Sequence, residues 1–295
     1  MKPDAVRRAA ANRKGLAVNE LEVAVIGTGW CGAAVLATLL GAAPGPPDAT
    51  TIQGVVRWLL TPISGSSAHP IVASIAWHGQ LMVLGMGLLT PPVVIVARFF
   101  KVTPRQDWPH HLDNPFWFVT HRRWGHVIGL IVAAGLAFVL AAYGWQPPWY
   151  SLHTATGWGV LVLVLIQVAG SWLRGTHGGP VDPFTRRRRP PEEWHGDHFS
   201  MTRRRIVFEY IHKSAGYVLL VLSLVAIPTG LVAADAPRWM PIAMGIWWLL
   251  MLGVFVWLQR AGLCTDTYQA IWGLDPDLPG NRRRPIGFGI VRIRR

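Results

Sequence analysis

Five long stretches of the sequence contain no charged residue. Lys, Arg, Asp and Glu are absent from residues 23–47, 58–97, 124–173, 214–234 and 239–259. A helix needs roughly 20 apolar residues to cross about 30 Å of hydrocarbon. The third stretch is long enough for two spans and is interrupted at Pro147–Pro148. The sequence therefore predicts an all-α integral membrane protein, a six-transmembrane-helix bundle.

The expected spans lie near 22–43, 71–97, 120–143, 151–173, 208–233 and 239–260. They divide the chain into an N-terminal tail (1–20), a membrane domain (21–260) and a C-terminal tail (261–295). The first span could instead be a signal peptide cleaved after Ala42–Ala43, although its uncharged run is long for one. Cys31 and Cys264 are not expected to form a disulfide, because they are predicted at different depths.

The positive charge is distributed unevenly between the two sides of the expected bundle. A net charge of +13 would suit a nucleic-acid-binding protein. However, alternate segments of the chain carry 26 Lys and Arg on one side and only Arg57 and Arg238 on the other. Because Lys and Arg are retained on the cytoplasmic side, both termini are predicted to be cytoplasmic. The preference for Arg over Lys indicates a bacterial protein of the inner (plasma) membrane, and nucleic acid is not an expected partner.

Five of the eleven histidines lie at or within the expected spans: His78, His121, His126, His153 and His212. Ionisable groups inside a membrane bundle are costly and usually functional. Since successive spans run in opposite directions, His78 and His153 lie toward the outer face and the other three toward the cytoplasm. The histidines thus fall at two ends of the membrane.

The depth of these histidines can be compared from the charged residues at the span ends. His78 lies 20 residues before Arg98 and His153 lies 21 before Arg174, each about 30 Å along a helix. His121 and His212 each stand two or three residues before an uncharged run. The sequence therefore predicts a level outer pair and a level inner pair, with His126 about 7 Å deeper.

Glycine follows three of these histidines at the position one helical turn later. The three are Gly125 after His121, Gly157 after His153 and Gly216 after His212. Glycine removes the side chain beside the histidine, as a flat macrocycle would require. His126 and His78 lack this feature, since Leu130 and Met82 occupy the corresponding positions.

Two level pairs of imidazoles suit two bis-histidine b-type haems, because imidazole is a common axial ligand and helical bundles often house cofactors. Alternatively, each histidine could form a hydrogen bond to a neighbouring helix. A metal site without porphyrin is disfavoured, since each level offers two histidines and no membrane-embedded carboxylate or thiol to complete the usual ligand set.

Several motifs resemble the cytochrome b561 family of transmembrane di-haem electron carriers. They are HGQLM at 78–82, VARFF at 96–100, WFVTH at 117–121, YSLHTATGW at 150–158 and IHKSAGY at 211–217. The resemblance covers about 70–235 and implies a four-helix core with two haem b groups, one ligated by His78 and His153 and one by His121 and His212. The family often has Gln where this chain has Gly125, so His126 stays open as an alternative to His121.

Four basic residues lie at the level of the inner haem and could pair with its propionates: Arg98, Arg122, Arg123 and Lys213. They could equally be ordinary cytoplasmic-side charges. We expect no further catalytic residue.

These features predict transmembrane electron transfer by a membrane oxidoreductase. In eukaryotic relatives the resemblance implies ascorbate as donor and ferric chelates as acceptors. The alternatives are a cytochrome b membrane anchor that exchanges electrons with quinone, or a haem-free histidine-containing transporter. The expected partners are the lipid bilayer, a small-molecule or quinone donor or acceptor, a redox protein, and a second copy of the chain in a homodimer.

Overall fold

The structure is a computed structural model of the chain, and it describes residues 51–66, 71–145, 151–182 and 187–293. Within these ranges it contains helices and no β-strand. Five helices are long and apolar enough to cross a membrane: Ala73–Phe99, Pro115–Tyr143, Leu152–Leu173, Arg203–Ala233 and Trp239–Arg260. The predicted all-α membrane bundle is confirmed. The expected first span, its cleavage site, Cys31 and the tail at 1–20 lie outside the described residues.

The described parts of the chain form five spans, with short helices before, between and after them. They are α3 (Ile52–Leu60), α4 (Ala73–Met82), the π-helix η1 (Val83–Leu89), α5 (Thr90–Phe99), α6 (Pro115–Tyr143), α7 (Leu152–Leu173), the 3-10 helix η2 (Pro191–Glu193), α8 (Arg203–Ala233), α9 (Trp239–Arg260) and α10 (Thr267–Trp272).

Two helices begin about one turn before the positions predicted from charge. Asn114 caps α6 by accepting a hydrogen bond from the Phe116 N–H, and Pro115 takes the first helical position. Thr202 caps α8 in the same way, with the Arg205 N–H as donor. Capping therefore extends both helices into the basic segments, which the absence of charge could not indicate.

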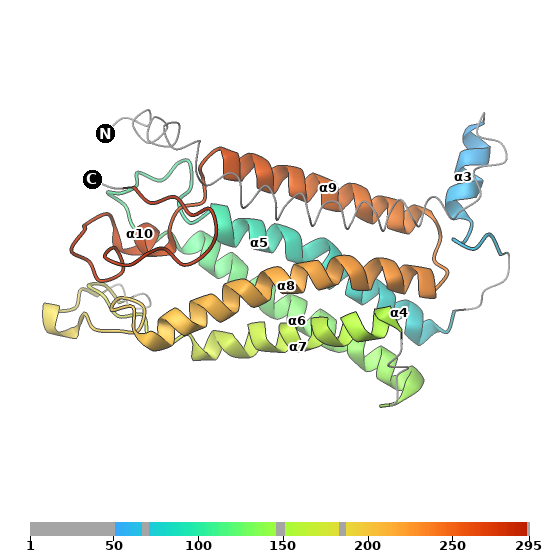
Figure 1. The fold of residues 1–295 in the computed structure, drawn as a ribbon, viewed down its shortest axis with the longest axis horizontal. Coiled ribbons are helices and arrows are strands. Elements are labelled where there is room, and N and C mark those ends of the chain that lie inside the picture. Colours follow the sequence, from blue (N-terminus) through green and yellow to red (C-terminus); the bar gives the residue numbers. More distant parts are fainter. Residues whose placement is uncertain (1–50, 67–70, 146–150, 183–186, 294–295) are drawn as a thin grey trace.

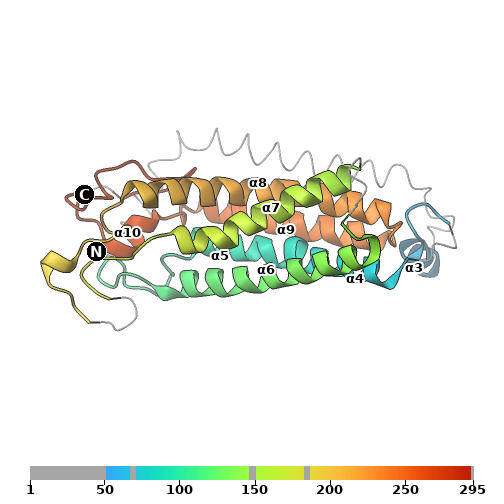
Figure 2. The same cartoon turned by 90° about the horizontal axis from the view of Figure 1, so that it is seen from below.

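The five spans lie side by side along the long axis of the molecule (Figures 1 and 2). α7 packs mainly against α8, α4 and α5 pack against α6, and α9 packs against α5. The main core lies between η1, α5, α6, α7 and α8. Its most buried members are Met86, Val93, Ile128, Val132, Val160, Val164, Leu219, Ala226, Ile227 and Leu231.

The π-helix η1 directly precedes the turn of α5 that contains Pro91–Pro92. Proline has no N–H, so Pro91 cannot donate to the Gly87 carbonyl one turn earlier. The indole Nε1 of Trp248 on α9 donates to that carbonyl instead, at 3.0 Å. A Cβ on Gly87 would lie 2.7 Å from Met244 Cε. The irregular segment is thus closely packed and hydrogen-bonded to α9.

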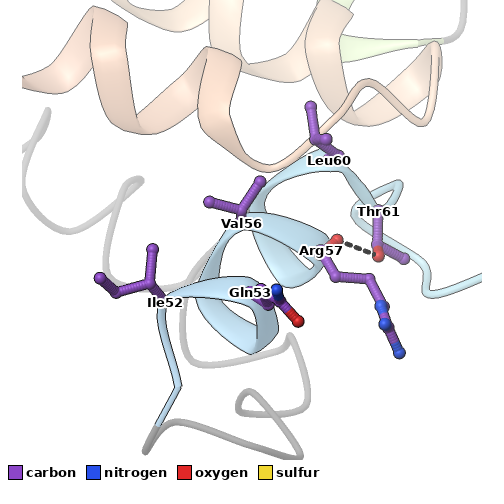
Figure 3. A pocket seen from close by; sticks show the side chains of 6 residues that line it. All are labelled: Ile52, Gln53, Val56, Arg57, Leu60 and Thr61. Atoms are coloured by element: carbon purple, nitrogen blue, oxygen red, sulfur yellow. Dashed lines mark hydrogen bonds between the residues drawn. The ribbon is translucent and has the colours of Figure 1, made fainter.

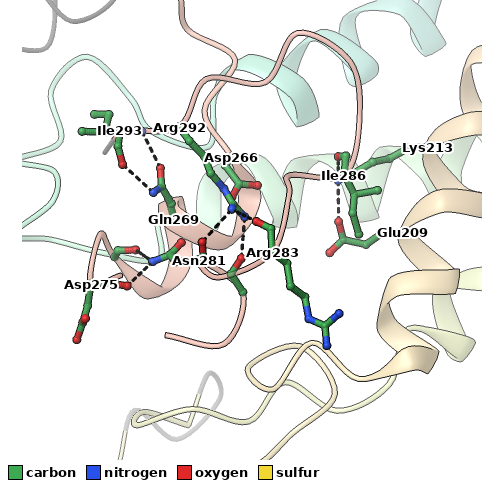
Figure 4. A network of polar contacts seen from close by, with 12 residues as sticks. Glu209, Lys213, Asp266, Gln269, Asp275, Asn281, Arg283, Ile286, Arg292 and Ile293 are labelled. Carbon is green, nitrogen blue, oxygen red and sulfur yellow. Dashed lines mark hydrogen bonds and ion pairs between the residues drawn. The ribbon is translucent and has the colours of Figure 1, made fainter. Parts of the chain in front are cut away.

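We call the end of the bundle that carries Lys101 and Arg205 the basic end. Here residues 261–293, the C-terminal cap, fold against α5, α8 and α9 (Figure 1). Arg292 forms an ion pair with Asp266 at 2.6 Å, and the Lys213 ammonium donates to the Ile286 carbonyl at 2.8 Å. Figure 4 shows this network. The predicted C-terminal tail is therefore a packed element of the basic end.

Candidate functional site

His78 on α4 and His153 on α7 face each other near the end of the bundle opposite the basic end. Their ring centroids are 6.2 Å apart and the rings are nearly perpendicular, at 78°. The Nδ1 atoms lie 2.9 Å from the backbone carbonyls of Gly135 and Ala226, respectively. Donation of Nδ1–H to a carbonyl leaves Nε2 as the free nitrogen, the usual arrangement of a metal-bound histidine.

Two glycines provide the space that this outer pair requires. A Cβ on Gly230 would lie 2.7 Å from Cε1 of His153. A Cβ on Gly135 would lie 2.9 Å from Cε of Met82, on the helix that carries His78. The outer pair is therefore held in place by close contact with the backbones of α6 and α8.

His121 on α6 and His212 on α8 face each other at the basic end. Their ring centroids are 5.8 Å apart, with an interplanar angle of 88°. Both Nδ1 atoms are buried and make no hydrogen bond of ordinary geometry, although the Val93 carbonyl approaches His121. The Gln167 side chain donates to the backbone carbonyl of His212 at 2.9 Å. The inner rings are thus oriented less tightly than the outer rings.

His126, the alternative to His121, belongs to neither pair. Its side chain is exposed, and its Nδ1 lies 2.6 Å from the Arg122 carbonyl of the same helix. The geometry therefore brings together the four histidines His78, His153, His121 and His212 and leaves His126 outside.

The space around both pairs fits a flat ligand with a central metal ion. Two imidazoles that bind one ion from opposite sides, with nitrogen–metal bonds of about 2 Å, place their ring centroids about 6 Å apart. A Cβ added to Gly125 or Gly157 would meet no atom within 4 Å, so open space lies one turn after His121 and His153. At Gly216 a Cβ would meet only Gln167 Nε2, at 3.4 Å. Haem thus fits the residues present.

The number of residues between the level of the inner pair and the level of the outer pair is the same on two helices. On α6, Gly135 lies 14 residues after His121, and on α8, Ala226 lies 14 residues after His212. The carbonyls of Gly135 and Ala226 contact the outer pair. At a rise of 1.5 Å per residue, the inner and outer pairs are ~21 Å apart along the bundle axis.

A cavity of about 950 Å³ surrounds the inner pair and extends to the C-terminal cap. Seven cationic side chains line it, against three carboxylates. The excess positive charge favours an anionic group inside the cavity. The cations are Arg98, Lys101, Arg122, Arg174, Arg189, Arg205 and Lys213, and the carboxylates are Asp113, Asp182 and Glu209.

The four predicted propionate partners differ in their contacts. Arg98 is buried and donates to the Tyr217 hydroxyl, Gln259 and the Phe288 carbonyl of the cap. Lys213 binds Glu209 at 2.7 Å and also contacts the cap. Arg122 lines the cavity, whereas Arg123 is exposed and does not line it.

Other cations of this cavity were missed by the sequence interpretation. Lys101 is fully buried, which lowers its pKa to about 8, and its ammonium donates to the Arg98 carbonyl at 2.9 Å. Burial also lowers the pKa of Arg174 to about 10. Both residues directly follow the last turn of a span. A basic residue at that position was the feature of the sequence that could have identified them.

A carboxylate and a thiol also lie at the inner level, although the sequence interpretation expected none there to complete a metal-ligand set. Glu209 on α8 and Cys264 of the cap are buried and line the same cavity. Glu209 is neutralised by Arg205 at 2.9 Å and Lys213 at 2.7 Å, which explains how a carboxylate is accommodated there. Within the described ranges, no group of three or more His, Cys, Asp and Glu side chains is arranged to hold a metal ion.

A third histidine pair lies outside the spans, near the cap. The rings of His177 and His198 are 5.6 Å apart at 72°, but both also pack against Trp272. A Cβ on Gly178 or Gly196 would clash with the backbone of the other glycine. Both histidines also line the cavity of the inner pair, so ring spacing alone does not identify a haem site. The packing of both rings against Trp272 distinguishes this pair from the other two.

Comparison with curated proteins finds two relatives from Arabidopsis thaliana. One is named a cytochrome b561, DM13 and DOMON domain-containing protein and is 26% identical over 71% of this chain and 21% of its own length. The other is named a cytochrome b561 and DOMON domain-containing protein and is 26% identical over 62% of this chain and 38% of its own length. The chain thus spans less than half of either relative. No family model and no solved structure matches it.

Proposed function

Because the chain belongs to the cytochrome b561 family, we propose that it carries electrons across a membrane by means of two bis-histidine b-type haems. The observation that carries this proposal is the presence of two facing histidine pairs, on four spans and at two levels ~21 Å apart. The relatives' names support a cytochrome b, and the number of haems rests on the geometry.

In this proposal His78 and His153 hold one haem, and His121 and His212 hold the other. Each haem supplies one-electron oxidation and reduction of its iron when bound. The Gly135 and Ala226 carbonyls accept the Nδ1 protons of the outer histidines, fix their tautomer and orient their rings. His126 is not needed as a ligand.

The residues between the two levels exclude water from the middle of the bundle. Ile128 and Val132 on α6, Val160 and Val164 on α7, and Leu219 on α8 are buried in one cluster. Such an apolar layer is closely packed, and the buried hydroxyls of Thr90 and Ser223 are held by hydrogen bonds to the Gly85 and Leu219 carbonyls of their own spans. We therefore infer that the path between the two sites is selective for electrons.

The cations of the inner cavity bind carboxylates in this proposal. Arg122 lines the cavity around the inner pair and is the propionate partner that we favour. Lys213 also lines it but already bonds to Glu209 and to the C-terminal cap. Arg98 already bonds to the C-terminal cap, so its main role is to hold the cap over the cavity. Arg123 takes no part.

The cellular setting is also part of the proposal. The basic end faces the cytoplasm, because 26 of 28 Lys and Arg residues mark one side, and a bacterial inner membrane fits the Arg-rich composition. A small molecule or quinone exchanges electrons at the inner cavity, and a redox protein or a second copy of the chain is compatible with the exposed surfaces.

The test is a reduced-minus-oxidised absorption spectrum of the purified protein, with haem quantified per chain. We expect Soret and α bands of low-spin haem b and two haems per chain. A protein without these bands would exclude the cytochrome function, and one haem per chain would exclude the two-pair arrangement.

A further inference from the structure

The short helix α3 lies at the end of the bundle opposite the basic end, across the direction of the spans. In Figure 1 it runs at a steep angle to the horizontal bundle, and in Figure 2 it is seen nearly end-on. A helix with this orientation lies parallel to the membrane plane when the spans cross the membrane.

Hydrogen bonds fix α3 at the level where a span begins. The Arg238 N–H donates to the Thr61 carbonyl at 3.1 Å, and the Ile63 N–H donates to the Ala236 carbonyl at 3.1 Å. The Asp235 carboxylate accepts from the Ser64 N–H at 2.7 Å. Because α9 starts at Trp239, these bonds hold the helix next to the membrane–water boundary.

The apolar residues of α3 lie on one face, at the spacing of an amphipathic helix. They are Ile52, Val55, Val56, Leu59 and Leu60. Figure 3 shows Val56 and Leu60 on the side of α3 turned toward the neighbouring helices, and Arg57 on the other side. The apolar face is therefore directed toward the depth of the spans and the polar face away from it.

The apolar face is largely uncovered by the described part of the protein. Ile52 is 84% exposed, Leu60 62% and Val56 47%. A shallow groove of about 550 Å³ lies at the edge of this face, where Ile52, Val56 and Leu60 meet the polar residues Gln53, Arg57 and Thr61. Exposed apolar side chains of this kind are unfavourable in water but stable at the boundary of headgroups and acyl chains.

We propose that α3 is a membrane-interface helix whose apolar face is inserted into the lipid headgroup–acyl boundary. Its occupant is lipid because the exposed apolar side chains of α3 are held at the level where α9 begins, which is marked by the exposed indole of Trp239. Arg57 stands on the polar side, where lipid phosphates lie. Through these hydrogen bonds, the helix thereby anchors the loop between α8 and α9. This inference requires the membrane spans but no haem.

Spin labels in lipid nanodiscs test the proposal. In a chain with Cys31 and Cys264 replaced by alanine, a nitroxide is attached at Val56→Cys on the apolar face or at the matched control Arg57→Cys on the polar side. Collision of the label with oxygen, which concentrates in hydrocarbon, is compared with collision with a water-soluble nickel chelate.

The label at position 56 should favour oxygen over the chelate several-fold more than the label at position 57. Equal access to the chelate at both positions would place α3 in water and overturn the proposal. Protection of position 56 from both reagents would also overturn it, because the face would then be covered by protein. Neither readout depends on bound haem, so failure here is distinct from failure of the electron-transfer proposal.

Discussion

The outer and inner histidine pairs have similar ring geometry but very different surroundings. The outer rings are fixed by two backbone carbonyls and by the close approach of Gly230. The inner rings have no hydrogen bond at Nδ1 and lie in a cationic cavity that the C-terminal cap covers. A tightly held ring favours one stable redox centre, whereas an open, charged cavity favours exchange with an anionic partner. We therefore propose that exchange of electrons with small molecules takes place mainly at the basic end.

Substitution of single histidines should distinguish the outer site from the inner site most strongly. We expect His153→Ala and His212→Ala each to reduce the haem content from two per chain to one, because each removes an axial ligand from one site only. The haem is measured as its pyridine complex after purification. His126→Ala is the matched control and should retain both haems, and a loss of haem in this variant would reassign the inner ligand.

Gly230→Ala should damage the outer site and spare the inner site. The new Cβ would lie 2.7 Å from the His153 ring, and overpacking of this kind costs about 1–3 kcal/mol, a roughly 5- to 150-fold weaker outer site. Gly253→Ala on α9 is the control, since a Cβ there meets nothing within 4 Å. Haem titration of the apoprotein measures the two affinities. Equal weakening of both sites would contradict the assigned separation.

Asp266→Asn should open the C-terminal cap and affect the inner site alone. The Asp266–Arg292 pair is buried, with side chains 5% and 14% exposed, and removal of one partner of a buried pair costs about 3–5 kcal/mol. We expect a hydrophilic reductant to reduce the inner haem several-fold faster in stopped flow.

The control for the cap variant is Asp277→Asn, which breaks a highly exposed ion pair with Arg282. Exposed pairs contribute about 0–1 kcal/mol, so this variant should behave as the wild type. An unchanged rate in Asp266→Asn would show that the cap does not limit access.

The smallest expected effect is a pH dependence of the inner haem. Burial lowers the pKa of Lys101 from 10.5 to about 8, so its positive charge is present at pH 7 and is lost as the pH rises toward 9. Loss of a nearby positive charge lowers a reduction potential. The inner potential should therefore fall over this range, by less than ~59 mV per pH unit, in a redox titration. Lys101→Met should remove this slope, and the outer potential should show none.

The depth of the histidines was predictable because charged residues mark the ends of each span. The partners of the histidines were not, because whether Gly135, Ala226 or Gln167 reaches a given histidine depends on helix rotation and packing. Glu209 lies within the expected span 208–233, but its pairing with Arg205 was not predictable because Arg205 precedes the expected start of that span.

The packing of the C-terminal cap was not predictable from the sequence for a different reason. Asp266 and Arg292 are far apart in a polar segment without periodicity, so nothing local indicates that they pair. The family resemblance was supported by relatives, but a resemblance confined to about 70–235 carries no information on this segment.

The π-helical segment Val83–Leu89 adjusts which face of its span is turned toward the two histidine pairs. Each of the four spans carries a histidine of one pair. At a second position, the same span also contacts a histidine of the other pair. These positions are 121 and 135 on α6, 153 and 167 on α7, 212 and 226 on α8, and 78 and 93 on the span formed by α4, η1 and α5. The interval is 14 residues, nearly four turns, in three spans and 15 in the fourth. A π-turn takes up one additional residue, so the fourth span keeps the same face toward both sites despite its longer interval.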